Sequence, residues 1–382
     1  MRDSASVVII GGGVVGASVA FHLTERGMTD VVVVDRSSLA SGSTGRSAGG
    51  VRQQFSTEIN CRMSIISVEK LLRFHETTGG EASFVQSGYL FLLSTAEDWA
   101  LFQRNVALQR SLGIDVELLD PEGAHRHLPP MRTDDLLGAT FCPTDGHADP
   151  TGVCLGYATA ARSRGVEVVA GVTVTGIETQ HQRVAAVNTD HGRIATPLVV
   201  NAAGPWAAQI AALASVEVPI RPYRRQLYYA ERPPEIPATA PMVVEFASSM
   251  YFRPEGPGLL LGMTDRSEPS SFNVNTDDAF LAMLVERAVR RVPRFEQVEL
   301  IRGWAGLYDV TPDANPIIGA VGDLEGFVMA AGFSGHGFMH SPATGQLVAE
   351  LITDGHTTTL DITPFSAARF ASGEISVERN VI

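Results

Sequence analysis

The sequence has few cysteines and no long apolar run. Its three cysteines, Cys61, Cys142 and Cys154, are odd in number and show no Cys-x-x-Cys spacing, so neither a disulfide framework nor a thiolate metal site is indicated. No run of about 18 apolar residues is present, and no basic segment followed by a long apolar one precedes the first glycine-rich turn. We therefore expect a cytoplasmic protein without a transmembrane segment.

Positive charge is also scarce. The sequence has 29 lysines and arginines and 42 aspartates and glutamates, which gives a net charge of −13. Nucleic acid and anionic membranes would repel such a chain, so we expect neither as a partner. A small-molecule substrate stays compatible with this charge, because one arginine can dominate the field of a pocket. With 382 residues, 45% of them hydrophobic, the chain should form about two domains.

A glycine-rich turn follows an apolar run close to the N-terminus. Residues 7–10 are Val-Val-Ile-Ile and residues 11–16 are Gly-Gly-Gly-Val-Val-Gly. A second apolar run, residues 31–34, ends at Asp35, nineteen residues after Gly16. This is the layout of a βαβ dinucleotide site. A glycine-rich turn that binds nothing would leave the position of Asp35 unexplained.

Each residue type in this motif has a physical task. Gly11 permits the tight turn, Gly13 lets the backbone approach a pyrophosphate, and Gly16 lets the helix pack closely on the strand. The helix N-terminus then faces the phosphate. Asp35 can accept hydrogen bonds from ribose hydroxyls and would repel a 2′-phosphate. FAD or NAD is therefore favoured over NADP.

The rest of the N-terminal region combines helices with a small-residue loop. Periodicity predicts helices over residues 14–26 and 59–76. Between them, residues 41–50 are rich in glycine and serine. Arg46 and Arg52 flank these glycines, so we expect a loop that wraps around a ligand in preference to a flexible linker.

The middle of the chain changes character twice. Strand and helix patterns return between residues 149 and 206, where we expect the chain to re-enter the nucleotide domain. Residues 221–300 contain short alternating runs broken by proline and glycine, then an amphipathic helix over residues 277–292, which suits an antiparallel sheet with a helix packed on it. The predicted strands there are residues 225–229, 249–253 and 258–262.

A second strand, glycine turn and helix occur near the C-terminus. Residues 327–331 read as a strand, residues 332–337 as a glycine-rich turn, and residues 341–352 as a helix. If this second helix N-terminus points at an isoalloxazine, it would stabilise the anion of reduced flavin, which favours FAD over NAD. His336 and His340 stand four residues apart without a carboxylate beside them, so no metal site is expected.

With these motifs in hand, the chain resembles the FAD-dependent amine oxidoreductases of the D-amino-acid oxidase superfamily over nearly its whole length. It is most similar to the branch of sarcosine oxidases, glycine oxidase, dimethylglycine dehydrogenase and the β subunits of L-proline dehydrogenases. The matching segments are residues 7–16 with Asp35, 41–55, 199–206, 304–313 and 330–339.

The resemblance implies a fold of the α/β plus antiparallel β class. In this family a Rossmann-like FAD-binding domain is assembled from separate segments, and the intervening parts form a discontinuous substrate domain on a mixed or antiparallel sheet. The implied FAD-binding segments are residues 1–85, 142–218 and 300–382. The implied substrate-binding segments are residues 86–141 and 219–299.

The resemblance also implies which residues contact FAD. Some relatives attach the flavin through a cysteine at the position of Gly306 or a histidine at that of Arg46, so this chain is expected to hold FAD non-covalently. The implied cofactor contacts are Gly11, Gly13, Val14, Val15, Gly16, Asp35, Arg36, Ser43, Thr44, Arg46, Ser47, Gly49, Val174, Ala203, Gly204, Trp206, Gly306, Gly332, Ser334, Gly335, His336, Gly337, Phe338 and Met339.

A smaller group is implied at the substrate. Arg52 matches a carboxylate-binding arginine, a task that suits a guanidinium. Tyr251 and Tyr308 match rings that line the substrate pocket. Arg253 shares a strand face with Tyr251 and is a second candidate anion contact, and His336 is expected to contact flavin or substrate. A purely structural role is the alternative for each of these side chains.

The implied function is oxidation of the carbon–nitrogen bond of a small secondary amine or amino acid, of the sarcosine, N-methyl amino acid or proline type. A hydride would pass to flavin N5 and leave an imine. The alternatives are a FAD-dependent 2-hydroxy-acid dehydrogenase and a non-catalytic flavoprotein that serves as an assembly factor or complex subunit.

Two replacements bear on the electron acceptor and on the substrate. Leu260 stands where a related oxidase has a lysine that activates oxygen, and Met339 where it has a lysine that binds the carboxylate. A dehydrogenase that passes electrons to a quinone or to a partner redox subunit, within a hetero-oligomer, is therefore expected alongside an oxidase that uses oxygen.

Overall fold

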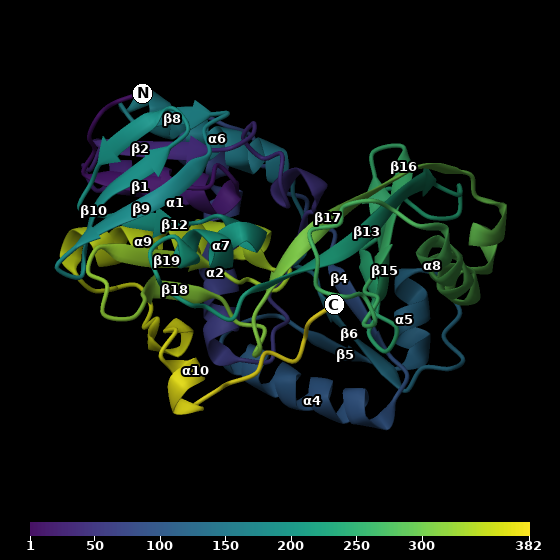
Figure 1. Ribbon diagram of the computed structural model, residues 1–382. Helices are drawn as coiled ribbons and strands as arrows, with labels where there is room; N and C mark the ends of the chain where they lie inside the picture. The colour runs from purple at the N-terminus through teal and green to yellow at the C-terminus, as the bar shows by residue number, and fades with distance from the viewer.

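The chain is described over residues 1–382 by a computed structural model. It has two parts that lie side by side, each built on its own sheet (Figure 1). The first sheet has the order β18-β19-β12-β1-β2-β8, and all of its neighbours are parallel except β18 and β19. Its strands are β1 (Val7–Ile10), β2 (Val31–Asp35), β8 (Glu167–Ala170), β12 (Val199–Asn201), β18 (Ile317–Ala320) and β19 (Phe327–Ala331).

Both faces of this six-stranded sheet are covered, which explains its continuous valine and isoleucine runs. Val7 and Ile9 face a core shared with the helices, whereas Val8 and Ile10 face a core shared with a three-stranded sheet and α7. The helices are α1 (Val14–Glu25), α2 (Glu58–Leu72), α6 (Pro150–Ser163) and α9 (Gly337–Asp354). The opposite layer is β9 (Val174–Gln180), β10 (Arg183–Thr189), β11 (Gly192–Ala195) and α7 (Ala207–Ala212).

The second part is built on an eight-stranded sheet of order β17-β13-β16-β15-β14-β4-β6-β5, antiparallel except where β14 pairs with β4. Its strands are β4 (Tyr89–Leu93), β5 (Glu117–Leu119), β6 (Gly138–Cys142), β13 (Arg221–Glu231), β14 (Met242–Glu245), β15 (Met250–Glu255), β16 (Gly258–Met263) and β17 (Leu300–Val310). The remaining elements are β3 (Gly50–Val51), β7 (Gly146–His147), α3 (Phe74–Thr78), α4 (Ala96–Ser111), α5 (Pro121–His127), α8 (Asp278–Arg291) and α10 (Arg369–Ser372).

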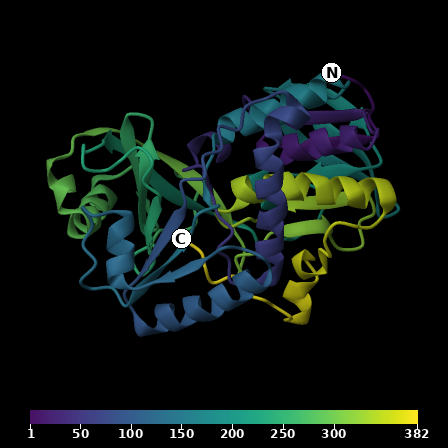
Figure 2. The ribbon, with the colours of Figure 1, turned by 180° about the vertical axis from the view of Figure 1, so that it is seen from behind.

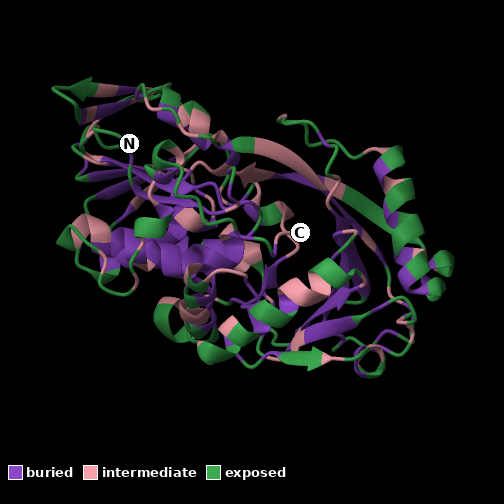
Figure 3. Cartoon of the chain, turned by 90° about the horizontal axis from the view of Figure 1, so that it is seen from below, coloured by how far each residue is buried: buried purple, intermediate pink, exposed green.

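One face of the eight-stranded sheet packs on helices α5 and α8. The opposite face carries Tyr89, Leu227 and Tyr251 and looks toward the first part. Seen from below, buried residues dominate the strands and the inner helices, and exposed residues gather at the periphery (Figure 3). Residues after α10 run to the junction of the two parts, where the C-terminus lies in Figures 1 and 2.

The expected fold class is confirmed, and several elements differ in detail. The helix predicted over residues 59–76 is divided into α2 and α3 at Arg73. The break turns Phe74 into the core, where its ring centroid lies 4.9 Å from that of Tyr157. α9 begins at Gly337, four residues before the predicted start, and β13 extends to 11 residues.

The domain division stays a prediction, but its last boundary does not coincide with the sheets. Residues 300–310, expected in the FAD-binding part, form β17, which pairs with β13 in the eight-stranded sheet. β17 therefore carries the chain from one part to the other. No helix is both long and apolar enough to cross a membrane.

The contact between α1 and α9 depends on a glycine. A Cβ at Gly345 would overlap Ser18 Oγ and come within 2.6 Å of His22 Nδ1. We expect Gly345→Ala to lower the free energy of unfolding by about 1–3 kcal/mol, because added volume at a tight helix contact forces a shift. Chemical denaturation measures this change.

The matched control is Leu155→Ala on α6, where the side chain is 42% exposed. Its expected effect is within about 0.5 kcal/mol. Equal losses in the two variants would contradict tight packing at Gly345.

Candidate functional site

A cavity of about 870 Å³ opens where the two parts meet. The six-stranded part supplies the ends of β1 and β2, the start of α1, and the turn before α9. The eight-stranded sheet supplies side chains from β13, β15 and β17. A concave site of this size between two parts is typical of a cofactor and substrate pocket.

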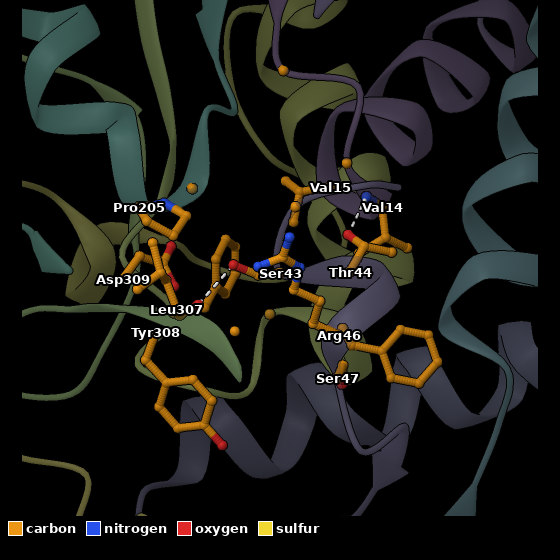
Figure 4. Close-up of a pocket in the computed structure, with 18 of the residues that line it drawn as sticks. Val14, Val15, Ser43, Thr44, Arg46, Ser47, Pro205, Leu307, Tyr308 and Asp309 are labelled. Carbon is orange, nitrogen blue, oxygen red and sulfur yellow. Dashed lines mark hydrogen bonds between the residues drawn. The ribbon is translucent and has the colours of Figure 1, made fainter. Parts of the chain in front are cut away.

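The start of α1 forms one wall of the cavity. Gly11 has a φ of +116°, and a Cβ there would come within 2.7 Å of the Ala202 carbonyl carbon. Gly13 is the helix N-cap and provides no side-chain cap. The Val14 N–H donates to Thr44 Oγ1 at 3.1 Å (Figure 4). The other N–H groups of the first turn have no side-chain partner, so this helix end can receive an anion.

Asp35 lies at the end of β2 and also lines the cavity. Its Oδ2 accepts the Gly12 N–H at 2.7 Å, and its Oδ1 accepts the Ser37 N–H at 2.8 Å. These bonds orient the carboxylate and leave lone pairs for ribose hydroxyls. Beside it, the Arg36 guanidinium lies 4.0 Å from the centroid of the Trp206 ring.

The segment after β2 ties the two parts together. Ser43 Oγ donates to the Leu307 carbonyl at 2.6 Å, a bond drawn in Figure 4. Arg46 Nη1 donates to the Ala305 carbonyl at 3.0 Å. A Cβ at Gly306 would approach Arg46 Cβ to 3.1 Å, so Arg46 packs directly over that glycine. The loop therefore closes around the cavity, as its composition predicts.

The turn before α9 forms the opposite wall. The Gly332 N–H donates to Asp309 Oδ2 at 2.7 Å. Burial raises the pKa of Asp309 to about 6, although backbone N–H groups of the turn oppose the shift. His336 is the N-cap of α9 and is 2% exposed. Burial holds the pKa of His336 well below its usual value, so the ring is neutral.

His336 and His340 do not form a metal site. Their ring centroids lie 5.1 Å apart, and His340 Nε2 is bonded to Ser64 Oγ at 2.9 Å. No third histidine, cysteine or acidic side chain joins them. Both rings contact Phe55, so the pair packs as part of the buried wall.

Arg52 is the main charged group at the far side of the cavity. It is 2% exposed, and its Nη1 donates to the Gln54 carbonyl at 2.7 Å. Its Nη2 donates to the Asn380 carbonyl, and its Nε is buried without a partner. Burial lowers the pKa of Arg52, but a guanidinium stays protonated in a protein. Arg52 is therefore a buried cation with no carboxylate partner.

Three tyrosines complete this side. Tyr89, Tyr251 and Tyr308 line the cavity from β4, β15 and β17. Burial raises the pKa of Tyr308, which the cations Arg225 and Arg52 partly oppose. All three rings supply apolar wall, and neutral hydroxyls offer hydrogen bonds.

Most predicted site residues do meet at this cavity. Arg52, Tyr251, Tyr308 and His336 line it. The predicted cofactor contacts that also line it are Gly11, Gly13, Val14, Val15, Asp35, Arg36, Ser43, Thr44, Arg46, Ser47, Val174, Ala203, Gly204, Trp206, Gly306, Ser334, Gly335, Gly337, Phe338 and Met339.

Four predicted site residues lie outside the lining. A Cβ at Gly16 would overlap the Gly11 carbonyl oxygen, and one at Gly49 would overlap that of Ala148. Gly332, with φ of +85°, instead shapes the turn. Arg253 Nε donates to the Ala48 carbonyl at 2.8 Å, and its guanidinium is paired with Glu255. Arg253 is thus engaged with the protein and does not point a free charge at the cavity.

Sequence reasoning missed other lining residues. Arg225 and Leu227 lie on a predicted strand, but nothing local shows which strand pairs beside it. Asp309 falls within a segment carrying the resemblance, but no local signal marks it as a lining residue. No sequence signal indicates that Val381 and Ile382 reach the cavity. The lining residues that the sequence did not predict include Tyr89, Arg225, Leu227, Met242, Asp309, Val381 and Ile382.

The geometry fits FAD. Two helix N-termini without side-chain caps, those of α1 and α9, open on one cavity. The α1 end would hold the pyrophosphate, Asp35 the ribose, and the turn before α9 the ring. A nicotinamide cofactor would not require the second helix end in this position.

Comparisons with known proteins agree. Residues 6–351 match the family described as FAD dependent oxidoreductase. The chain is 34% identical over 427 residues to the Bos taurus FAD-dependent oxidoreductase domain-containing protein 1, covering 100% of this chain and 87% of that protein. It is 32% identical over 372 residues to the mitochondrial sarcosine dehydrogenase of Mus musculus, covering 93% of this chain and 40% of that protein.

Among solved structures, L-proline dehydrogenase from P. horikoshii superposes with a TM-score of 0.92 at 35% identity, covering 98% of this chain and 100% of that one. Sequence, fold and cavity thus point to one family. The chain belongs to the FAD-dependent oxidoreductases of the D-amino-acid oxidase superfamily.

Proposed function

We propose that this protein oxidises the carbon–nitrogen bond of a small secondary amine or amino acid of the sarcosine, N-methyl amino acid or proline type, giving an imine. The observation that carries this proposal is the buried, unpaired guanidinium of Arg52 among three tyrosines, in the cavity that also has the features of a FAD site. The names of the sarcosine and L-proline dehydrogenases to which the chain is similar support it.

Arg52 would bind the substrate carboxylate. Its two carbonyl partners hold the guanidinium in a defined orientation, and its Nε has no partner in the protein. An isolated charge in a buried position is unfavourable unless it is paired. A carboxylate would supply that pairing with a charge-assisted hydrogen bond.

The remaining groups suit oxidation of a neutral amine. The rings of Tyr89, Tyr251 and Tyr308 exclude water and hold the hydrocarbon part of a substrate. His336 is neutral, so it adds no further positive charge beside the amine. FAD, when bound, supplies the two-electron acceptor.

The electron acceptor is proposed to be a quinone or a partner redox subunit in preference to oxygen. The chain has one lysine, Lys70, which lies on α2 outside the cavity lining. Leu260 is buried in an apolar cluster. No ammonium group is therefore available to stabilise superoxide. A hetero-oligomer and a cytoplasmic location stay predictions.

Anaerobic flavin reduction tests the proposed reaction. Sarcosine, dimethylglycine, proline, hydroxyproline, D-amino acids and lactate are mixed with the holoprotein, and flavin absorbance is followed by stopped flow. At least one amine should bleach the flavin, and reoxidation in air should be slow. Bleaching by lactate alone would favour the 2-hydroxy-acid alternative. If no substrate reduces the flavin, the result would favour the alternative of a non-catalytic flavoprotein that serves as an assembly factor or complex subunit.

Arg52→Gln tests the carboxylate contact. Loss of a charge-assisted hydrogen bond of about 1.5–3 kcal/mol should raise the KM of a carboxylate-bearing amine by roughly 10- to 100-fold. Arg253→Gln replaces an equally buried arginine that lies outside the cavity lining and is bonded to the Ala48 carbonyl, so it should leave KM unchanged. A raised KM in Arg253→Gln together with an unchanged KM in Arg52→Gln would instead identify Arg253 as the anion contact.

Release of the cofactor tests its mode of attachment. None of the three cysteines lines the cavity, and Gly306 and Arg46 offer no nucleophile. Denaturation in guanidinium followed by ultrafiltration should therefore release all of the yellow colour into the filtrate. Flavin absorbance that stays with the protein would contradict non-covalent binding.

The buried carboxyl group of Asp309 should make the free energy of unfolding depend on pH. Because burial raises its pKa to about 6, the folded chain binds this proton more tightly than the unfolded chain. Its contribution to stability is therefore present at acidic pH and is lost as pH rises through 6. Asp309→Asn should remove that part of the decline, measured by chemical denaturation between pH 4 and 8. If the free energy of unfolding changes with pH in the same way in the wild-type protein and in Asp309→Asn, the raised pKa is contradicted.

A further inference from the structure

A second unpaired guanidinium faces the cavity. Arg225 lies on β13, directly opposite Gly306 of β17, so the two residues share one face of the sheet. Its Cζ lies 4.9 Å from the centroid of the Tyr308 ring. Arg225 and Arg52 thus both line the cavity. The positive charge of each partly opposes the rise that burial causes in the pKa of Tyr308.

Arg225 has little to bond with inside the protein. Its Nη1 donates to the Arg224 carbonyl at 2.8 Å, and its Nε is buried without a partner. The neighbouring Arg224 points to the other face of the sheet, where it forms ion pairs with Glu268 at 2.7 Å and Asp277 at 2.8 Å. The carboxylates near this strand are therefore used by Arg224, and Arg225 makes no ion pair.

No acidic side chain in the cavity lining pairs with either cation. The only acidic lining residues are Asp35 and Asp309. Asp35 is bonded to backbone N–H groups at the end of β2. Asp309 is bonded to the turn before α9. Neither forms an ion pair with Arg52 or Arg225.

We propose that Arg225 is a second anion contact and that the substrate is an amine with two acidic groups, one bound by Arg52 and the other by Arg225. This inference rests on the proposed function, since it names the class of amine that the cavity takes. Leu227 and Met242, which also line the cavity, provide apolar surface for the carbon chain between the two acids. A cation without a protein counterion is compensated when a ligand brings the opposite charge.

Two thioethers that are not oxidised by the flavin allow binding to be measured separately from oxidation. Thiodiacetate carries two carboxylates, and (methylthio)acetate carries one, with sulfur in place of the amine nitrogen in both. Each is titrated into the holoprotein while flavin absorbance is recorded. The wild-type protein should bind thiodiacetate about tenfold more tightly or better, the range of one charge-assisted hydrogen bond.

The variants assign this difference to a residue. Arg225→Gln should lose the preference for thiodiacetate and bind (methylthio)acetate as before, and Arg225→Lys should keep part of the preference. Arg52→Gln should weaken both ligands. Arg221→Gln, an exposed position on the same strand, should change neither.

Several outcomes would overturn the inference. These are equal binding of the two thioethers to wild-type protein, an unchanged preference in Arg225→Gln, or loss of FAD from both Arg225 variants, which would make Arg225 a cofactor contact. Reduction of the flavin by sarcosine and by iminodiacetate is measured in parallel. Reduction by either amine with no role for Arg225 defeats this inference alone, whereas absence of reduction by every amine defeats the proposed function.

Discussion

The close approach of α1 to the end of β1 is the constraint on which the site depends. Gly16 lies against the Gly11 carbonyl so tightly that no Cβ fits between them. The helix therefore starts directly at the carboxyl end of the sheet, and its first N–H groups open on the cavity. α9 lies along α1 (Figure 2) and contacts it through Gly345 and Ser18, which brings a second helix N-terminus to the same cavity.

Hydrogen bonds between segments far apart in the sequence hold the residues around the cavity in place. Ser43 and Arg46 donate to carbonyls of β17. On the other side, the Glu378 carboxylate accepts hydrogen bonds from Ser56, Thr57 and Asn60, and this anchors the segment that supplies the Asn380 carbonyl to Arg52. The position of the Arg52 guanidinium thus depends on chain far away in sequence. Such support orients a charged group before the ligand arrives.

The predictions that succeeded rest on local signals. The first βαβ unit and the second glycine turn are each encoded within a short run, so their strands, turns and helix starts are correct within a few residues. The helix predicted over residues 59–76 failed at Arg73 because the break serves the packing of Phe74, which no local pattern reveals. The boundary at residue 300 differs because the pairing of β17 with β13 is a contact between distant segments.

The two arginines of the eight-stranded sheet show the same limit at the site. Because side chains alternate along a strand, Arg253 and Tyr251 are correctly predicted to share one face of the sheet. Strand register then places Arg253 beside Leu260, one cross-strand row away from Tyr251, where it meets the Ala48 carbonyl. Arg225 lies on the opposite side of the Tyr251 row, beside Gly306 and the cavity. Alternation predicts a face, but only register predicts a position along it.

The sequence by itself determined the dinucleotide motif, the second glycine turn and the acidic residue at the end of β2. These are properties of neighbouring residues, so propensity and spacing are enough to encode them. Tertiary structure alone decided that Arg225 lines the cavity and Arg253 does not, that Asp309 is buried beside the turn before α9, and that the Asn380 carbonyl is bonded to Arg52. The reason is physical: burial and charge pairing arise from contacts between segments that lie up to 328 residues apart.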